Sequence, residues 1–482
     1  MTLDEKKLPD RRSVLKSGVT VMGGLLAAST VLGRPYVARA QTAKPSQLTM
    51  LYATVEADSD AVKTLLPQFK SLYGIDIAMD TMPYNALQQK VFAELASKSS
   101  YYDIVIVDAP WMSAVIDNIH PITDMILDSS MTDADFDIAD FIPKVFYDTA
   151  VFKPSASTVH WSGAGDADVD AKSIKQGGFE IYGLPIQANA LTMSYRKDLF
   201  EDAANKAAFQ AKYGKPLAVP ETWDDFVQVA SFFTQPSKRI WGTTLMGGAG
   251  DWATDDFKTM LASFGGDGYM INDKFEPVFA GPEGVAALSF YTDLINKYKV
   301  TPPGTTSASW DTAATEFETG LVAMSMNYHT EKLNSTVNGT MDYAMVPKKV
   351  QYGPHFGAMM LAVNAFSKNK EWAYRTIQFL TGKASQTAML PLQLHPTRRS
   401  AYAVAAKDPS YAAKFGNFYP VLGQSLEHGF GRPRLKNYSD VDRSIWVAVN
   451  DAARRAATPE AALAKAAEQV KAQLAQAGYT PR

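Results

Sequence analysis

The stretch that decides the fold is Tyr102-Asp103-Ile104-Val105-Ile106-Val107-Asp108-Ala109-Pro110-Trp111. Its centre, residues 104–107, is an unbroken run of apolar β-branched side chains. Strands of a parallel sheet, which are buried on both faces, have this pattern. Ligands of such sheets lie beyond the carboxyl ends of the strands. Asp108 and Trp111 directly follow the run, so both are candidate site residues.

The residues before this stretch alternate between strand and helix patterns. Apolar side chains alternate over 48–52 and 75–79, as they do in strands. They recur at helical spacing over 62–72 and 87–95. Strands that alternate with helices predict a parallel sheet with helices on its faces, so the fold class is α/β.

Two later helices have clear start signals. Thr222 precedes Asp225 by three residues, which resembles a capping box, and an apolar helical stripe follows. Thr458-Pro459-Glu460 has an N-cap threonine and a proline at the first helical position. Both signals predict helices in the second half of the chain.

Composition excludes several classes of protein. The 482 residues are 46% hydrophobic and 20% charged, the usual balance of a folded globular protein. The formal net charge is −3, with both signs interspersed, so there is no nucleic-acid footprint. There are no cysteines, which excludes disulfides, thiol nucleophiles, iron–sulfur clusters and a lipid-modified N-terminal cysteine.

The first 40 residues have the pattern of an export signal. Arg11-Arg12 precedes an uncharged stretch from Ser17 to Gly33, and Ala38-Arg39-Ala40 is a small-x-small cleavage pattern. Paired arginines and a weakly apolar segment indicate a twin-arginine signal peptide, cleaved after Ala40. The alternative, a membrane anchor, needs about 20 apolar residues. We therefore expect a periplasmic protein that is not embedded in the membrane.

Catalytic and metal-binding motifs are nearly absent from the sequence. It contains no G-x-S-x-G, no H-E-x-x-H and no phosphate-binding G-x-x-x-x-G-K-[ST] pattern. Two aspartate clusters, at 133–137 and 166–170, lack the glycine and glutamate that a calcium loop requires. The six histidines have no metal-ligand spacing. We therefore expect no catalytic residues, no metal and no cofactor.

Aromatic residues in polar loops are the strongest chemical signal. Trp111, Trp252, Trp310 and Tyr328 lie beside glycine, proline and polar residues. Sugar rings have apolar C–H faces and a rim of hydroxyls, so their sites combine flat aromatic side chains with hydrogen-bonding groups. For any single tryptophan, packing in the core is the competing interpretation.

Several motifs, taken in order, resemble the family 1 extracellular solute-binding proteins, which capture substrates for ABC importers, typically of carbohydrates. The motifs are Tyr102–Trp111, Tyr182–Pro185 with Ala190–Asp198, Pro220–Phe226, Phe317–Met324 and Pro396–Tyr402. The resemblance covers most of residues 46–475. It implies a two-lobed periplasmic-binding-protein fold, type II-like, in which each lobe is a mostly parallel sheet flanked by helices.

The resemblance also implies a division of the chain. The N-terminal lobe is expected to hold 46–188 and 328–362, and the C-terminal lobe 190–326 and 364–482. The expected hinge lies near 187–189, 327–328 and 363–364. A ligand is expected in the cleft between the lobes.

Site residues follow from positions that match the family pattern. The expected ligand-binding residues are Glu56, Asp108, Trp111, Asn189, Trp252, Trp310, Tyr328, His329, His355, Gly357 and Arg398. Asp108, Asn189 and an arginine, either Arg398 or Arg399, are expected to bond hydroxyls, with Trp111 and Tyr328 stacking on a sugar ring. Relatives that bind oligosaccharides often have an acid at the position of Asn189, which argues against such a ligand.

The expected function is capture of a small carbohydrate or polyol and its delivery to ABC importer permease subunits, by a monomer that binds no nucleic acid. A receptor of the same fold for a sugar phosphate, a polyol phosphate or a polyamine is the first alternative. A periplasmic hydrolase or cofactor enzyme is the second, and the lack of a nucleophile or metal motif argues against it.

Overall fold

The computed structural model describes residues 43–54, 58–154, 167–328 and 332–479. The predicted signal peptide, Glu56 and His329 lie outside the described residues. Within the described ranges, no helix has both the length and the apolar character that crossing a membrane requires.

The first sheet is built around the strand predicted at Ile104–Val107. Its order is β2-β1-β3-β12-β4, with β7 also paired to β12. The strands are β1 (Gln47–Ala53), β2 (Asp76–Met82), β3 (Ile104–Asp108), β4 (Ile119–His120), β7 (Gly183–Ala190) and β12 (Phe356–Asn364). β1 pairs in parallel with β2 and β3, and every residue of β3 is buried, as predicted. β12 runs antiparallel to β3, β4 and β7, so the sheet is mixed.

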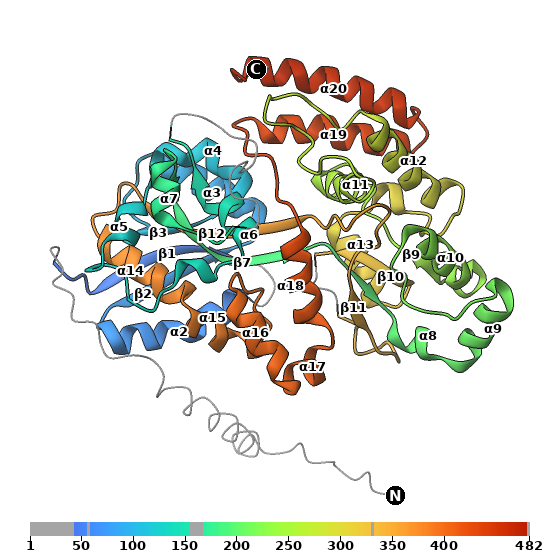
Figure 1. The fold of residues 1–482 in the computed structure, drawn as a ribbon, viewed down its shortest axis with the longest axis horizontal. Helices are drawn as coiled ribbons and strands as arrows, with labels where there is room; N and C mark the ends of the chain where they lie inside the picture. Colours follow the sequence, from blue (N-terminus) through green and yellow to red (C-terminus); the bar gives the residue numbers. More distant parts are fainter. Residues whose placement is uncertain (1–42, 55–57, 155–166, 329–331, 480–482) are drawn as a thin grey trace, which may run out of the picture. The chain divides into compact units, whose positions relative to one another are not determined.

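Helices cover both faces of this sheet (Figure 1). They are α2 (Asp58–Tyr73), α3 (Tyr84–Ala96), α4 (Met112–Val115), α5 (Thr123–Leu127), α6 (Pro143–Ala150), α7 (Ala171–Gln176), α14 (Lys370–Thr381) and α15 (Lys383–Met389). A two-stranded sheet, β5 (Val151–Phe152) with β6 (Glu180–Ile181), lies at the same core. Apolar side chains from these elements form one buried cluster, which we call the first core.

The second sheet has the order β11-β8-β10-β9. Its strands are β8 (Thr192–Tyr195), β9 (Trp241–Thr243), β10 (Val322–Asn327) and β11 (Asp342–Ala344). β9 pairs in parallel with β10, whereas β8 runs antiparallel to β10 and β11. Each large sheet therefore has one strand that runs against the others.

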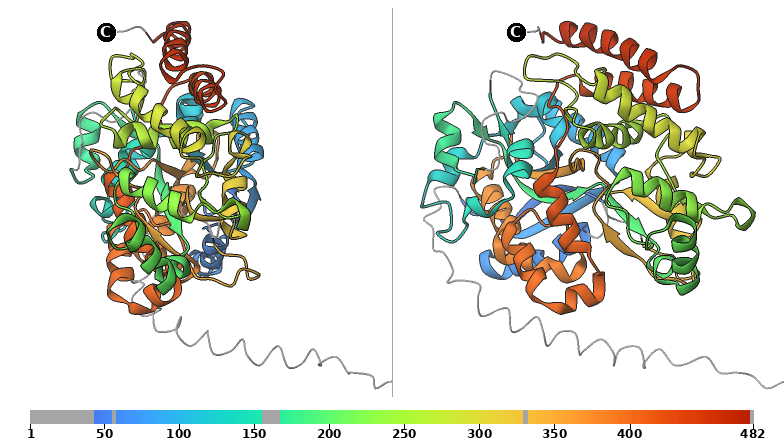
Figure 2. Two further views of the ribbon diagram at one scale, coloured as in Figure 1. Left: turned by 90° about the vertical axis from the view of Figure 1, so that its right-hand side faces the viewer. Right: turned by 45° about the vertical axis from the view of Figure 1, so that its right-hand side comes forward.

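A second, separate core packs around this sheet. Its helices are α8 (Lys197–Glu201), α9 (Ala203–Tyr213), α10 (Trp223–Phe233), α11 (Asp251–Ser263), α12 (Pro282–Asn296), α19 (Tyr438–Ala453) and α20 (Pro459–Gln476), and α13 (Trp310–Glu318) lies against β10. α19 and α20 lie side by side (Figure 2). Thr222 and Thr458 cap α10 and α20 as predicted, with hydrogen bonds to the amides of Asp225 and Ala461.

A third apolar cluster contains side chains from α16 (Arg399–Lys407) and α18 (Phe418–His428), with α17 (Pro409–Phe415) packed beside it. The cluster also includes Ala188 and Ala190 of β7 and Tyr343 of β11. It therefore contacts both large sheets where the chain passes from one to the other.

The predicted division into lobes differs from the packing at two places. The chain leaves the first sheet at Leu191, close to the predicted hinge at 187–189. However, β11 was expected in the first lobe and pairs instead with β8 of the second sheet. α14 and α15 were expected in the second lobe, but their apolar side chains belong to the first core. Strand pairing and helix burial therefore shift the later crossings to residues 345–355 and 428–437.

Candidate functional site

Asp108 and Tyr84 meet at the carboxyl end of β3. Asp108 is buried and caps the 3₁₀ turn Ala109–Trp111 by accepting the amide hydrogen of Ala109 at 2.9 Å. The hydroxyl of Tyr84, the first residue of α3, donates to the other carboxylate oxygen at 2.5 Å. Burial raises the pKa of Asp108 above its usual value. This end of the strand therefore presents a carboxylate and a half-buried phenol.

Trp111 packs against Tyr84 on the side that faces the first core. Its side chain is only 3% exposed, and its ring lies 5.0 Å from that of Tyr84 and 6.3 Å from that of Phe92. The sequence predicts that Trp111 stacks on a ligand. The structure instead places Trp111 in the first core, and the half-buried ring at this edge belongs to Tyr84, which is not among the residues predicted from the sequence.

Trp252, Trp310 and Tyr328 form a continuous aromatic group on the second lobe. The ring centroids of Trp252 and Trp310 are 5.3 Å apart, and those of Trp310 and Tyr328 are 6.3 Å apart, both in edge-to-face geometry. All three side chains are half-buried. Trp252 donates its indole N–H to the carbonyl of Gly248 at 3.1 Å. The buried indole nitrogen of Trp310 has no partner among the described residues.

A buried group of charges lies beneath these rings. Asp255 on α11 is 2.6 Å from the ammonium of Lys258 and 2.9 Å from the guanidinium of Arg432. Burial alone would raise the pKa of Asp255, but the two cations outweigh it and hold that pKa well below its usual value. Burial lowers the pKa of Lys258 to about 8. Asp251, at the start of α11, has a pKa that burial and the nearby Asp255 raise.

Arg432 links the two lobes at this point. One guanidinium nitrogen donates to Asp255 at 2.9 Å and to the hydroxyl of Tyr328 at 2.9 Å. The other lies 3.6 Å from the carboxylate of Asp108, at the end of the first sheet. Tyr328 in turn donates its hydroxyl hydrogen to Asp255. The guanidinium of Arg432 therefore lies between two carboxylates, Asp108 of the first lobe and Asp255 of the second.

Asn189 and Gly357 join this group through the pairing of β7 with β12. The two residues are partners in the strand register. A Cβ atom on Gly357 would lie 3.2 Å from the side-chain oxygen of Asn189 and 3.7 Å from the ring of Tyr328. The absence of a side chain at 357 therefore leaves room where Asn189 and Tyr328 approach each other.

His355 and Arg398, both predicted to bind ligand, are fully buried. His355 lies behind Tyr328, at 6.0 Å between ring centroids, and its Nδ1 is 3.1 Å from the carbonyl oxygen of Phe430. Burial lowers the pKa of His355 well below its usual value, so the ring is neutral. Its Nε2 is 3.5 Å from Asp255, so His355 packs against the charged group rather than facing a ligand.

Arg398 belongs to the framework of the first lobe. Its guanidinium stacks 3.9 Å from the ring centroid of Phe141 and donates to the carbonyls of Thr381 and Asp137. Arg399, the other arginine considered, pairs with Glu427 at the surface. The structure therefore brings Asp108, Asn189, Trp252, Trp310, Tyr328 and Gly357 together, and the arginine that lies beside Asp108 and Tyr328 is Arg432.

The sequence analysis missed Tyr84, Asp251, Asp255, Lys258 and Arg432. Only two of the missed positions had a usable signal. Gly247-Gly248-Ala249-Gly250 lies directly before α11, and a glycine-rich loop before a helix places Asp251 and Trp252 at the helix start. Arg432-Pro433-Arg434 was not considered, although proline between two arginines restricts the backbone of that segment.

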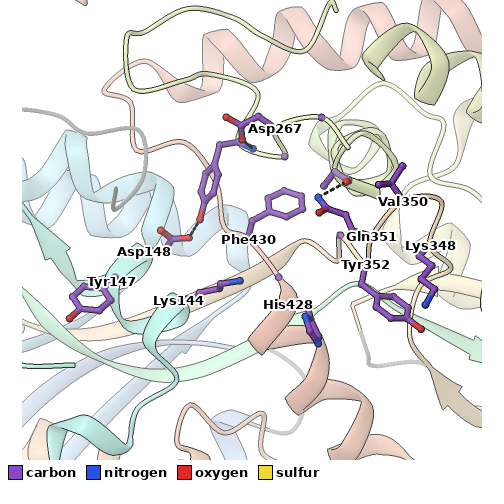
Figure 3. Close-up of a pocket in the computed structure, with 16 residues that line it drawn as sticks. Lys144, Tyr147, Asp148, Asp267, Lys348, Val350, Gln351, Tyr352, His428 and Phe430 are labelled. Carbon is purple, nitrogen blue, oxygen red and sulfur yellow. Dashed lines mark hydrogen bonds between the residues drawn. The ribbon is translucent and has the colours of Figure 1, made fainter. Parts of the chain in front are cut away.

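A separate cavity of about 640 Å³ also has walls from both lobes. Figure 3 shows Lys144, Tyr147 and Asp148 on one side of it, and Lys348, Val350, Gln351 and Tyr352 on the other. The ring of Phe430 packs between His355 and Tyr269, with centroids at 5.7 and 5.8 Å, and so separates this cavity from Tyr328. Asp148 accepts the hydroxyl hydrogen of Tyr269 across the two lobes (Figure 3).

No cluster of three or more side chains able to hold a metal ion occurs in the part of the chain that the structure describes. The site instead contains carboxylates, an amide, phenols and indoles, together with an ammonium and a guanidinium that pair with the carboxylates. These groups suit an uncharged ligand with many hydroxyls.

Comparisons with known proteins agree with this arrangement. The family model described as "Bacterial extracellular solute-binding protein" matches residues 53–387. A mannitol-binding protein of Pseudomonas aeruginosa is 27% identical over 216 residues, which span 42% of this chain and 46% of that protein. A probable amino-acid ABC transporter periplasmic-binding protein of Sinorhizobium fredii is 24% identical over 74% of this chain and 80% of its own length.

Solved structures have the same two-lobed fold. Maltose-bound MalE3 of T. maritima superposes with a TM-score of 0.69 and 25% identity, over 89% of this chain and 100% of that one. The predicted α/β fold with two lobes is therefore confirmed. With more than half of its length matched by the family model, the chain belongs to the bacterial extracellular solute-binding proteins.

Proposed function

We propose that this protein is exported to the periplasm, binds a small uncharged carbohydrate or polyol between its lobes and delivers it to the permease subunits of an ABC importer. The observation that supports this most directly is the convergence of Asp108 and Tyr84 from the first lobe with Trp252, Tyr328 and Asp255 from the second. Aromatic faces suit the C–H surface of a sugar or polyol, and carboxylates accept hydrogen bonds from its hydroxyls.

The balance of charge favours an uncharged ligand. The two buried cations of the site already have carboxylate partners: Asp255 lies against both Lys258 and Arg432, and Asp108 lies 3.6 Å from Arg432. A phosphate or an amino-acid carboxylate would need a cation of its own, and would also approach Asp108 and Asp251. A polyamine could pair with these two acids, but Arg432 already lies 3.6 Å from Asp108 and would repel a second cation there. The mannitol-binding relative and the maltose-bound structure support the same ligand class.

The proposed mechanism is binding without chemistry. A ligand that contacts both lobes stabilises the closed arrangement and shifts the population toward it. The closed form is the one we expect to dock on the permease, as a monomer. The family is one of binding proteins, and we assign no catalytic step to the site.

Thermal unfolding of the purified chain from Gln41 onward tests the proposal. The panel holds mannitol, ribitol, glucose, maltose, their phosphates where available, glutamate and putrescine. A ligand at 100 times its Kd adds about 2.7 kcal/mol. At roughly 2–4 °C per kcal/mol the midpoint rises by several degrees. Shifts only with phosphates, with glutamate or with putrescine would replace the proposed ligand class, and no shift at all would remove the proposal.

A pair of tryptophan variants separates binding from folding. Trp252 and Trp446 are both half-buried and pack against the second core, but only Trp252 lies in the site. Trp252→Ala should weaken binding about tenfold, which corresponds to about 1.4 kcal/mol. Trp446→Ala should lower the melting temperature and leave affinity unchanged. Equal losses of affinity in both variants would contradict the assignment of the site.

A further inference from the structure

The segment from α18 to α19 contains a short connector, which we define as Phe430-Gly431-Arg432-Pro433-Arg434. All five residues are buried, although they form neither a helix nor a strand. The carbonyl of Phe430 accepts the amide hydrogen of Phe356 at 2.9 Å. The amide of Phe430 donates to the carbonyl of Pro354 at 3.2 Å. A buried irregular segment must find partners for its backbone groups. The connector is therefore held in a defined path.

Arg434 ties the connector to the first lobe. Its guanidinium donates to the carbonyls of Tyr147, at 3.2 Å, and Val151, at 2.5 Å. The same group lies 4.9 Å from the ring centroid of Phe152. The carbonyl of Arg434 accepts a hydrogen bond from Ser113 at 2.7 Å. Arg434 is only 1% exposed, so none of these contacts involves the surface.

Gly431 supplies a second attachment. Its amide donates to the carboxylate of Asp148 on α6 at 3.1 Å. A Cβ atom at 431 would lie 2.8 Å from the same carboxylate oxygen, so only glycine allows this approach. Between these two attachments, Pro433 fixes its own φ and has no amide hydrogen to donate. The backbone on both sides of Arg432 is thus restrained.

Arg432 itself reaches away from these anchors. It contacts Asp108 of the first lobe and Asp255 and Tyr328 of the second, at the distances given above. The anchors lie in α4, α6 and β5, outside the group of side chains proposed to contact ligand. A long flexible side chain loses conformational entropy when it is fixed, so a restrained backbone makes such a bridge less costly.

We propose that Arg434 is a positioning residue for ligand binding: by holding the connector in the first lobe, it places Arg432 between Asp108 and Asp255. Arg432 then contributes to specificity, because its guanidinium lies 2.9 Å from Asp255 and 3.6 Å from Asp108, so that neither acid faces a ligand as an isolated charge. This inference rests on the proposed function, since it concerns the same site. Arg434 would thus affect ligand affinity although it lies outside the group of side chains proposed to contact ligand.

Arg398 offers a matched control. Like Arg434, it is fully buried, stacks on phenylalanine rings and donates to backbone carbonyls of the first lobe. Unlike Arg434, it has no connection to Arg432. Arg434→Lys and Arg398→Lys should both lower the melting temperature, because each replaces a buried guanidinium, which stacks on a ring and donates to two carbonyls, by an ammonium. Only Arg434→Lys should weaken binding of the ligand found in the panel, by about fivefold to tenfold.

A double variant distinguishes positioning from general damage. If Arg434 acts through Arg432, Arg432→Met with Arg434→Lys should bind the ligand no more weakly than Arg432→Met alone. Additive losses, or an affinity of Arg434→Lys within twofold of the wild type, would overturn the inference.

A measurement without ligand keeps this test separate from that of the proposed function. Hydrogen exchange of the peptide covering residues 251–258, at the start of α11, should accelerate in Arg434→Lys and not in Arg398→Lys. This peptide contains Asp255 and lies in the other lobe. Unchanged exchange there would refute the positioning role even if no panel member bound. Absence of binding with accelerated exchange would refute only the ligand class.

Discussion

Replacing Asp255 by asparagine tests the charged group at the site most directly. The carboxylate of Asp255 is 1% exposed and lies 2.6 Å from Lys258 and 2.9 Å from Arg432, whose side chains are 0% and 9% exposed. Asparagine keeps the shape but removes the carboxylate that lies against both cations; Arg432 then retains Asp108, at 3.6 Å. Removing one partner of a buried pair costs about 3–5 kcal/mol. At roughly 2–4 °C per kcal/mol, the melting temperature should fall by about 10 °C.

The assay is thermal unfolding of wild type and Asp255→Asn, with Asp224→Asn as the control. Asp224 pairs with Lys349 at the surface, where its side chain is 74% exposed and the pair is worth at most about 1 kcal/mol. The pKa of Asp255 is held below its usual value, so its contribution is complete above about pH 4 and is lost as the pH falls through that lowered pKa. The deficit should therefore be constant between about pH 5 and about pH 7. A loss no larger than that of the control would refute the reasoning.

Three further outcomes are expected. Burial raises the pKa of Asp256 to about 8, so its folded form holds a proton that the unfolded chain releases near pH 4. The free energy of unfolding of the wild type should therefore fall as the pH rises from about 4 to about 8, by up to about 1.4 kcal/mol per pH unit. Urea titrations at several pH values should show a flatter slope for Asp256→Asn. An equal slope in the variant and the wild type would contradict the raised pKa of Asp256. Gly357→Val should weaken binding in calorimetry, whereas Gly304→Ala, which meets no atom within 4 Å, should bind normally. Thr222→Ala should cost about 1 kcal/mol through loss of the cap on α10, measured by chemical denaturation, with ligand affinity unchanged.

Local sequence patterns were sufficient for the first five elements of the described chain, from β1 to β3. The apolar run at Ile104–Val107 predicts β3, and the alternating patterns before it predict β1, β2 and the helices between them. β1 pairs with β2 and β3, which follow it closely in the sequence, so local periodicity is enough to predict this part of the sheet. β11 has only three residues and pairs with a strand some 150 positions earlier, so no local pattern could assign it to a sheet.

The site was harder to predict because its charges are buried. Asp255, Asp256 and Lys258 are charged residues of types that are seldom buried, but α11 is buried along almost its whole length. One partner of Asp255 in this buried group, Arg432, lies 177 residues away in the sequence. Trp111 shows the opposite error: an aromatic residue in a loop-like segment turned out to be core, as the competing interpretation allowed.

The cavity beside Phe430 offers a practical use, since the chain contains no cysteine. Lys144 lies on its first-lobe wall and Val350, which is 71% exposed, on the opposite wall (Figure 3). Cysteines introduced at these two positions would be the sole thiols in the protein and could carry a donor and an acceptor dye. Any change in the separation of the lobes would then alter energy transfer between the dyes. The protein would become an optical reporter of its own ligand, with no need to know that ligand beforehand.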